Sequence, residues 1–105
     1  MLFVAGQVGW NARNEMIGER LIDQIRQALE NIVSILKTGG AEPRHIVRMT
    51  WYVTDLDDYR SSSREIGKVY RSVLGNHYPA MTLVRVSELL EDGARVEIEA
   101  TAVIP

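Results

Sequence analysis

The sequence predicts one α+β domain in which a mixed β-sheet carries two α-helices on one face. Two segments have the apolar spacing of amphipathic helices, four short segments are rich in β-branched or aromatic residues, and strand and helix alternate before a closing pair of strands. Helices of ~19 residues and strands of ~8 to 10 residues both span roughly 30 Å, so two helices can cover a four-stranded sheet. Residues 1–105 are close to the commonest domain size, and we expect a single domain.

The first strand and the first helix are expected in the opening third of the chain. Leu2–Gln7 is a short apolar run of the kind that forms a strand. A helix is predicted at residues 19–37, because apolar side chains recur there at helical spacing and charged residues fill the other faces. These apolar residues are Leu21, Ile25, Leu29, Ile32, Ile35 and Leu36. Gly39 and Gly40 end the helix as a left-handed cap would.

A second strand and a second helix follow. Residues 45–54 are rich in β-branched and aromatic side chains and predict the strand. Asp55 begins an acidic turn that can cap the next helix, which we place roughly at residues 59–74. One stripe of that helix is apolar, and it consists of Ile66, Val69, Tyr70 and Val73. Gly75 and the asparagine after it close the helix.

The last two strands are predicted at residues 80–86 and 95–104. Glu91-Asp92-Gly93 lies between them, and its glycine can supply the positive φ that a hairpin connection needs. We therefore expect these two strands to pair with each other as a hairpin. Any parallel pair in the sheet is expected to have a right-handed crossover.

One face of the predicted sheet has no helix to cover it. In the last strand, apolar residues alternate with Glu97 and Glu99, so one side faces the core and the other carries two carboxylates. We expect the helix-free face to carry both apolar and charged side chains, namely Tyr52, Leu83, Arg48, Arg85, Glu97 and Glu99, with Trp51 as a further candidate. This mixture is too apolar for a solvated surface and suits a partly wet subunit interface, so self-association is predicted.

Composition excludes several classes of partner and site. The formal net charge is −2, with 12 basic and 14 acidic residues and no basic cluster, so no nucleic-acid partner is expected. The chain has no cysteine, which excludes disulfides, a thiolate nucleophile and a zinc-thiolate site, and favours a cytoplasmic protein. Its two histidines are far apart and no phosphate-loop motif is present, so neither a metal nor another cofactor is expected. No apolar run approaches the length of a membrane span.

Several segments, in order, resemble one family. Phe3-Val-Ala-Gly-Gln, Gln27-Ala-Leu-Glu-Asn-Ile, the strand that ends in Val-Thr-Asp55, Pro79-Ala80 and Val96-Glu-Ile-Glu-Ala all match its motifs. The family is that of the Rid (YjgF-like) reactive-intermediate deaminases. The resemblance implies a chorismate-mutase-like fold, a homotrimer whose sheets line a central barrel, and ligand clefts between neighbouring subunits. It also implies that residues 1–105 lack the family's extra N-terminal strand and its lid loop.

The family's reaction is the hydrolysis of an enamine or imine to a carbonyl compound and ammonia, which needs a carboxylate to position water and move protons. The resemblance assigns this role to Glu97, whose alternative role is an interface ion pair with Arg48 or Arg85. The family arginine that binds a substrate carboxylate is replaced by Met81, which offers neither charge nor donor.

The predicted substrate-binding residues lie on several segments: Ala5, Gly6, Ser63, Tyr78, Met81 and Arg85. The main prediction is a deaminase acting on a reactive enamine or imine. The main alternative is a non-catalytic trimer that binds a small metabolite or regulates a pathway, because Met81 replaces the arginine. A third function, the endoribonuclease activity of some relatives, is disfavoured by the acidic balance and the lack of paired catalytic histidines.

Overall fold

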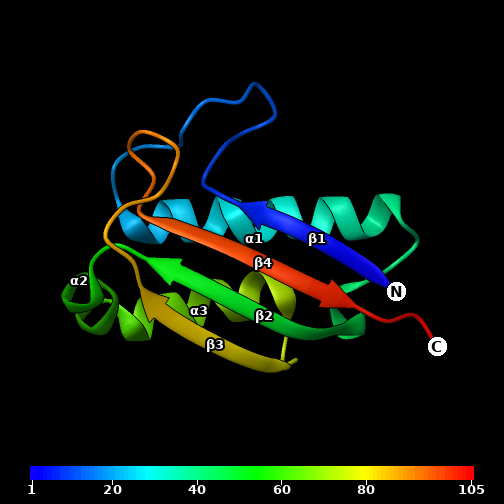
Figure 1. Cartoon of the computed structure of the whole chain (residues 1–105). Helices are drawn as coiled ribbons and strands as arrows, with labels where there is room; N and C mark the ends of the chain where they lie inside the picture. Colours follow the sequence, from blue (N-terminus) through cyan, green and yellow to red (C-terminus); the bar gives the residue numbers. More distant parts are fainter.

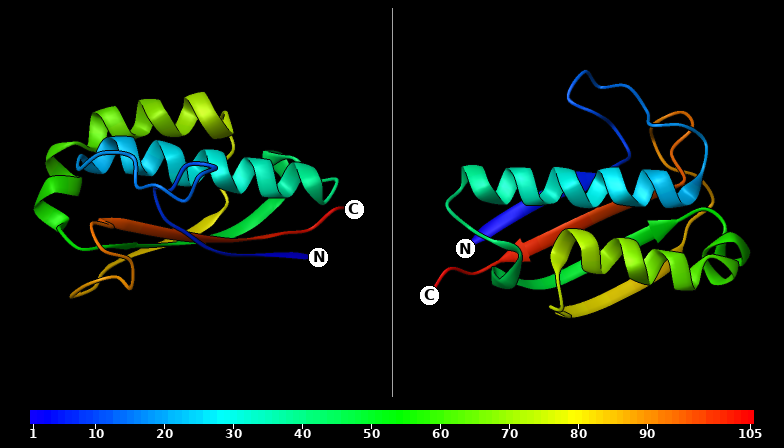
Figure 2. Two further views of the ribbon diagram at one scale, coloured as in Figure 1. Left: turned by 90° about the horizontal axis from the view of Figure 1, so that it is seen from above. Right: turned by 180° about the vertical axis from the view of Figure 1, so that it is seen from behind.

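The protein is a four-stranded mixed sheet with helices on one face only, as Figures 1 and 2 show. A computed structural model describes residues 1–105. The strands are β1 (Leu2–Gln7), β2 (Ile46–Val53), β3 (Ala80–Arg85) and β4 (Val96–Ala102). The helices are α1 (Leu21–Thr38), α2 (Leu56–Ser61) and α3 (Ser63–Leu74), with a short 3₁₀ turn at Pro43–His45. The predicted fold class is therefore confirmed.

The order of the strands in the sheet is β1-β4-β2-β3. β4 is antiparallel to both β1 and β2, whereas β3 runs parallel to β2 at the edge. The predicted hairpin between the last two strands is therefore wrong, because β2 separates them. Gly93 does have a positive φ of 78°, but it lies in the long loop 86–95, which crosses over the end of β2 instead of making a tight turn.

Burial explains why β4 is central and β3 is at the edge. Every second residue of β4 is buried, from Val96 to Ala102, whereas no residue of β3 is fully buried. A strand that has a neighbour on both sides and helices over one face buries the most apolar surface. The strand with the most regular apolar alternation therefore lies in the interior of the sheet. The β2–β3 connection passes through α2 and α3 behind the sheet and is right-handed, as predicted (Figure 1).

The second predicted helix is two helices. Asp55 caps α2 as expected, since its side chain accepts a hydrogen bond from the backbone N–H of Asp58 at 3.0 Å. α2 ends at Ser61, and α3 begins at Ser63 after a residue with φ −103° and ψ 8°. The prediction missed this break because serines compete weakly with the helical backbone and give no strong stop signal. α3 closes at Gly75, as predicted, and this glycine has a positive φ of 74°.

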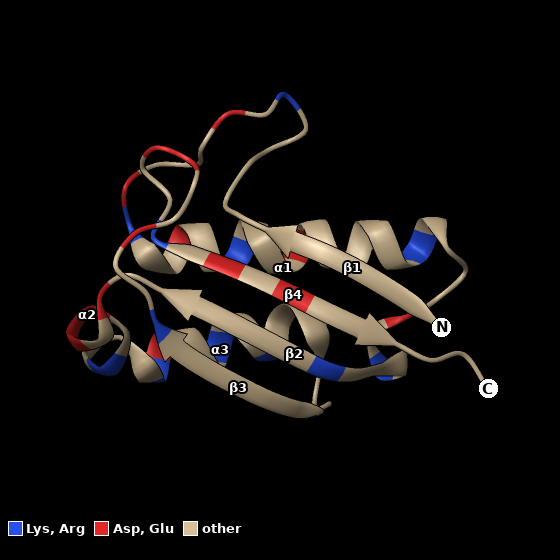
Figure 3. Ribbon diagram, in the orientation of Figure 1, with Lys and Arg blue, Asp and Glu red and all other residues tan.

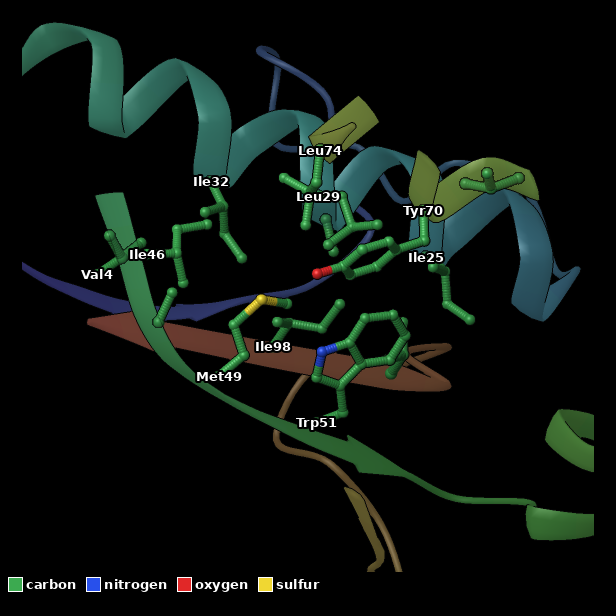
Figure 4. Close-up of a cluster of buried hydrophobic side chains, with 14 of the residues drawn as sticks. Val4, Ile25, Leu29, Ile32, Ile46, Met49, Trp51, Tyr70, Leu74 and Ile98 are labelled. Atoms are coloured by element: carbon green, nitrogen blue, oxygen red, sulfur yellow. The ribbon is translucent and has the colours of Figure 1, made fainter. Parts of the chain in front are cut away.

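The core lies between the sheet and helices α1 and α3 (Figure 4). Trp51, Met49 and Val53 of β2 point into it together with Ile46, and Trp51 is only 1% exposed. The expectation that Trp51 could lie on the helix-free face is therefore wrong. A bulge between Ile46 and Arg48 adds one residue to β2 and leaves Val47 exposed, so Ile46 joins the core despite the strict alternation of the sequence.

β3 also presents a different face from the one predicted. Its parallel register pairs Met81 with Met49, Leu83 with Trp51, and Arg85 with Val53. Because paired residues share a face, these three β3 side chains lie on the helix-covered side of the sheet. The placement of Leu83 and Arg85 on the helix-free face is therefore wrong, and Thr82 and Val84 occupy that face instead.

One buried polar side chain joins three separate segments. Gln24 of α1 is fully buried and donates to the carbonyls of Gly18 and Gly93 at 3.1 and 2.9 Å. Its side-chain oxygen accepts from the backbone N–H of Arg95 at 2.7 Å. These bonds fix the loop before α1 to the loop before β4. Elsewhere, no helix combines the length and the apolar composition that crossing a membrane requires.

Candidate functional site

The helix-free side of the sheet carries one carboxylate that nothing in the chain neutralises. We call this side the open face and define it by the outward residues Phe3, Ala5, Arg48, Thr50, Tyr52, Thr82, Val84, Glu97, Glu99 and Thr101. In Figure 3 two acidic positions lie on β4, and one basic position lies near the start of the neighbouring strand β2. Glu97 is half-buried there and forms neither a hydrogen bond nor an ion pair within the chain. Both of its oxygens are therefore available to a water or a ligand.

Gly6 gives the Glu97 side chain its position. β1 has an irregularity between Val4 and Gln7, so its backbone bends where it passes Glu97. A Cβ atom at position 6 would lie only 2.6 Å from Oε2 of Glu97, so the carboxylate lies directly against the glycine. Only glycine leaves that space at this point of the strand.

Glu99 is engaged, in contrast to Glu97. The hydroxyl of Tyr52 donates a hydrogen bond to Oε1 of Glu99 at 2.9 Å. This hydrogen bond is the main reason that the pKa of Tyr52 is raised above its ordinary value. Desolvation and the negative charges of Glu99 and Glu97 raise the pKa further, and the positive charge of Arg48 lowers it. Tyr52 therefore stays a neutral donor at physiological pH and holds Glu99 in place.

A shallow hollow of about 420 Å³ lies on the open face, across β1, β4 and β2. Its lining combines apolar residues with polar and charged ones: Phe3, Val4, Ala5, Arg48, Thr50, Glu99, Ala100 and Thr101. Ala5 therefore lies close to Glu99 of β4 in this hollow. The hollow is open to one side, so a second surface is needed to enclose a ligand in it.

A second cavity lies on the opposite side of the sheet, at the β3 edge. We call it the edge pocket; its volume is about 220 Å³, and its lining is Trp51, Tyr59, Ser63, Ile66, Gly67, Tyr70, Arg71, Tyr78, Pro79 and Met81. Three of the predicted substrate-binding residues, Ser63, Tyr78 and Met81, meet here. Arg85 lines neither this pocket nor the hollow on the open face.

Aromatic rings form the rigid walls of the edge pocket. Tyr70 and Tyr78 are stacked with ring centroids 5.4 Å apart, and Trp51 contacts Tyr59 edge-to-face at 6.4 Å. The hydroxyl of Tyr70 donates to the carbonyl of His77 at 2.5 Å. Burial raises the pKa of Tyr70, with a smaller contribution from Tyr78, and burial also raises the pKa of Tyr59. These rings are therefore neutral and fixed in orientation.

The side chain of His77 makes a structural hydrogen bond. Its Nε2 lies 2.7 Å from the carbonyl oxygen of Ile46, so this nitrogen carries the proton and donates it to the backbone. Together with the Tyr70 bond to the His77 carbonyl, this contact fixes the segment that leads into β3. A role for His77 as a free acid or base is not favoured by this arrangement.

The predicted site residues thus form two groups on opposite sides of the sheet. Ala5, Gly6 and Glu97 lie on the open face, and Ser63, Tyr78 and Met81 lie in the edge pocket, whereas Arg85 belongs to neither group. Sequence reasoning missed Arg71 and Gly67 of the edge pocket, because a helical arginine and a helical glycine look like surface positions. The signal that could have revealed them is their spacing of four residues, which puts both on one side of α3.

Comparison with known proteins shows extensive similarity along the chain. A sequence model of the family described as Endoribonuclease L-PSP matches residues 1–104. A RutC family protein of Pyrococcus horikoshii is 35% identical over 102 residues, which covers 96% of this chain and 77% of that protein. The protein of Capra hircus named 2-iminobutanoate/2-iminopropanoate deaminase is 31% identical over 103 residues, which covers 97% of this chain and 72% of that protein.

A solved structure has the same architecture. The crystal structure of Escherichia coli TdcF with bound serine matches with a TM-score of 0.85 at 31% identity, and the match covers 98% of this chain and 80% of that one. A likeness of this extent confirms the mixed sheet with helices on one face.

Proposed function

We propose that this chain, which belongs to the Endoribonuclease L-PSP family of YjgF-like or Rid proteins, hydrolyses a reactive enamine or imine to a carbonyl compound and ammonia. The observation that carries the proposal is the unpaired Glu97 carboxylate, which lies against Gly6 on the open face. The name of the Capra hircus relative, an iminobutanoate and iminopropanoate deaminase, supports the same reaction class.

Glu97 performs the proton transfers in this mechanism. Its carboxylate orients a water molecule and accepts a proton as the water oxygen bonds to the iminium carbon. The carboxylic acid formed then returns that proton to the nitrogen of the tetrahedral carbinolamine. The C–N bond breaks, the carbinolamine hydroxyl becomes the carbonyl, and ammonia leaves with the released proton as ammonium. An enamine enters the same path after protonation at carbon. Correct general acid–base positioning typically contributes ~10² to 10⁴-fold in rate.

The site is completed by a second copy of the chain. The open face is mixed in polarity, and Phe3 is 78% exposed on it, which is unfavourable for a free surface. We propose a homotrimer in which Glu97 of one subunit faces the edge pocket of its neighbour. Ala5 and Gly6 would then line the catalytic side of the cleft, and Ser63, Tyr78 and Met81 its substrate side. Arg85 lies outside both cavities and has no role in this proposal.

A steady-state assay tests the reaction. Imines generated in situ from amino acids decay slowly in buffer, and the protein is expected to accelerate the decay and the release of ammonia. Glu97→Gln keeps the shape of the side chain but removes the base, so it should lower kcat by ~10² to 10⁴-fold. Glu99→Gln is the matched control on the same strand, because Glu99 is already bound by Tyr52, and it should keep most of the activity.

Two other outcomes would point to other functions. If wild type and Glu97→Gln both match buffer across a panel of imines, deamination is wrong and the protein is a small-metabolite-binding or regulatory protein, which the Met81 substitution favours. If labelled RNA is degraded by material that co-elutes with the protein, the endoribonuclease activity named in the family description applies. The net charge of −2 argues against that result.

A further inference from the structure

The edge pocket contains a cation that has no partner in the chain. Arg71 lines the pocket from α3, and none of the ion pairs or side-chain hydrogen bonds of the structure includes it; the paired arginines are Arg20, Arg44, Arg60 and Arg95. A Cβ atom at Gly67 would lie 3.3 Å from Nη1 of Arg71, so the guanidinium lies over that glycine. The missing side chain at position 67 therefore gives the guanidinium its place at the pocket.

The remainder of the pocket is apolar and aromatic. Trp51, Ile66 and Pro79 are parts of its lining, and Met81 lies at its β3 side. A cavity of about 150 Å³ lined by apolar side chains is large enough to bind benzene. The edge pocket, at about 220 Å³, therefore has room for a substituted aromatic ring or a branched apolar chain of similar size. Methionine adapts its shape to such groups and makes favourable contacts with aromatic rings.

We propose that the edge pocket binds an amphipathic anion, with an aromatic or branched apolar body between Trp51 and Met81 and a carboxylate held by Arg71. Arginine binds carboxylates through two parallel hydrogen bonds, so Arg71 supplies from α3 the anion contact that Met81 cannot make. The inference rests on the proposed function in one respect: it names the substrate as the imine of an aromatic or large apolar amino acid. The methyl group of 2-iminopropanoate would leave most of this pocket empty.

Calorimetric titration of the unmodified protein tests the binding directly. The probes are phenylacetate and its neutral isostere phenylacetamide, which differ only in the charge that Arg71 is proposed to bind. We expect phenylacetate to bind at least about tenfold more tightly, and the difference to shrink as salt is raised, because Arg71 is exposed to solvent. Equal affinity for the two probes, or no heat from either at millimolar concentration, would overturn the proposal.

Two arginines of the same helix provide a matched pair of variants. Arg71→Gln should weaken phenylacetate binding by about tenfold and leave phenylacetamide unchanged, while Arg71→Lys should recover part of the loss. Arg64→Gln removes the same charge from α3, but Arg64 is exposed and lies outside the pocket, so binding should not change. Equal effects of the Arg64 and Arg71 substitutions would show that only the overall charge matters, which contradicts a built site.

The Glu97→Gln variant separates this inference from the proposed reaction. It should bind phenylacetate at least as tightly as the wild type, because it removes a negative charge that faces the pocket in the proposed trimer, while its hydrolysis of imines falls by ~10² to 10⁴-fold. Binding without hydrolysis in the wild type would overturn the reaction and leave the ligand class standing. Hydrolysis of small imines without preference for aromatic ones would overturn the ligand class and leave the reaction standing.

Discussion

Gly6 determines where the carboxylate of Glu97 can lie, because the two residues are in direct contact. Replacing Gly6 with alanine would bring a methyl group to 2.6 Å from Oε2 of Glu97, so the carboxylate must move. The backbone at position 6 is not in the left-handed region, and Gly→Ala at a permitted conformation stabilises a protein by about 0.4–1 kcal/mol. Activity and stability should therefore respond differently to the same change.

We predict that Gly6→Ala lowers kcat for imine hydrolysis by more than about tenfold, while the free energy of unfolding in urea changes by less than ~1 kcal/mol. The control is a double-mutant cycle, because in a Glu97→Gln background the alanine should cost no further activity. A Gly6→Ala protein with wild-type kcat would contradict the role of the glycine in positioning Glu97.

Met81 defines a second prediction for a single residue. Met81→Arg places a guanidinium at the β3 side of the edge pocket, where it can bind the carboxylate of a small imino acid. We expect kcat/KM for 2-iminobutanoate to rise by about tenfold, and binding of phenylacetamide to weaken because the longer side chain fills the pocket. Met81→Leu keeps the apolar character and should change neither value greatly. If Met81→Arg brings no gain in kcat/KM, the absence of an arginine at position 81 is not what limits the hydrolysis of small imino acids.

The sequence predicted some of these residues and not others for physical reasons. Alternation in the last strand was enough to place Glu97 opposite the core, because a central strand with one covered face leaves no other arrangement. The sequence could not show which face of the sheet each β3 residue occupies, because β3 is short and has apolar residues on both faces. Only its pairing with β2 determines those faces. Arg71 could not be identified, because its importance comes from the empty space above Gly67.

Among the elements, α1 depends on one buried amide more than on its caps. Gln24 makes three hydrogen bonds that link the loops around Gly18, Gly93 and Arg95. Gln24→Met keeps the volume but leaves these backbone groups without partners, and each unsatisfied buried group costs about 1–3 kcal/mol. We predict a loss of about 2–4 kcal/mol in the free energy of unfolding, measured in urea.

The matched control for this prediction lies three residues further along α1. Gln27 bonds only to Asn31 within α1, at 2.9 Å, and is half-buried. Gln27→Met should cost less than about 1 kcal/mol. Similar losses from the Gln24 and Gln27 substitutions would contradict the linking role of Gln24.

The tyrosines that α2 and α3 contribute make stability sensitive to alkaline pH. The pKa values of Tyr59 and Tyr70 are raised in the folded protein by burial. The unfolded chain therefore releases these protons at a lower pH than the folded one, and the free energy of unfolding should fall as the pH rises above about 10. Below that pH both states hold the protons, so these groups cause no pH dependence there.

Urea midpoints measured from about pH 8 to pH 11 would show this decline. Tyr70→Phe removes one of the two groups and should flatten the decline, although it also removes the bond to the His77 carbonyl and lowers stability at every pH. A decline of equal steepness in the wild type and in Tyr70→Phe would mean that Tyr70 does not contribute to it.

The elements themselves were largely predictable, but their neighbours were not. The strand at Leu2–Gln7 has the predicted bounds, and α1 begins two residues later and ends one residue later than the predicted helix at residues 19–37. Local periodicity fixes such elements, because it reports which side of each is apolar. The pairing of β4 with β1 and β2 is non-local and depends on which strands bury the most apolar surface. Gly93 in the connecting loop is typical of a hairpin, and it led to the wrong prediction that β4 pairs with β3.

At the scale of the whole molecule, the open face predicts assembly. Phe3 at one edge and Val84 at the other are exposed to 78% and 41%, with a polar strip between them. We predict that sedimentation equilibrium gives a mass near three times the 11.9 kDa of one chain. Phe3→Asp should shift the mass towards one chain, because it places a charge in the contact.

Leu90→Asp is the matched control for assembly. Leu90 is 92% exposed and lies in the loop 86–95, outside the open face, so the same change should leave the mass unaltered. A wild-type protein that sediments as one chain at micromolar concentration would contradict the homotrimer and, with it, the completed cleft.

The position of β4 also constrains how the protein can be made. β4 is the last strand to leave the ribosome, yet it lies between the first two strands of the chain. β1 pairs with no other strand, so it has no partner while residues 96–102 are still inside the exit tunnel. The nascent chain therefore exposes the apolar sides of β1 and β2 until residues 96–102 have left the tunnel, and the sheet cannot close before that point.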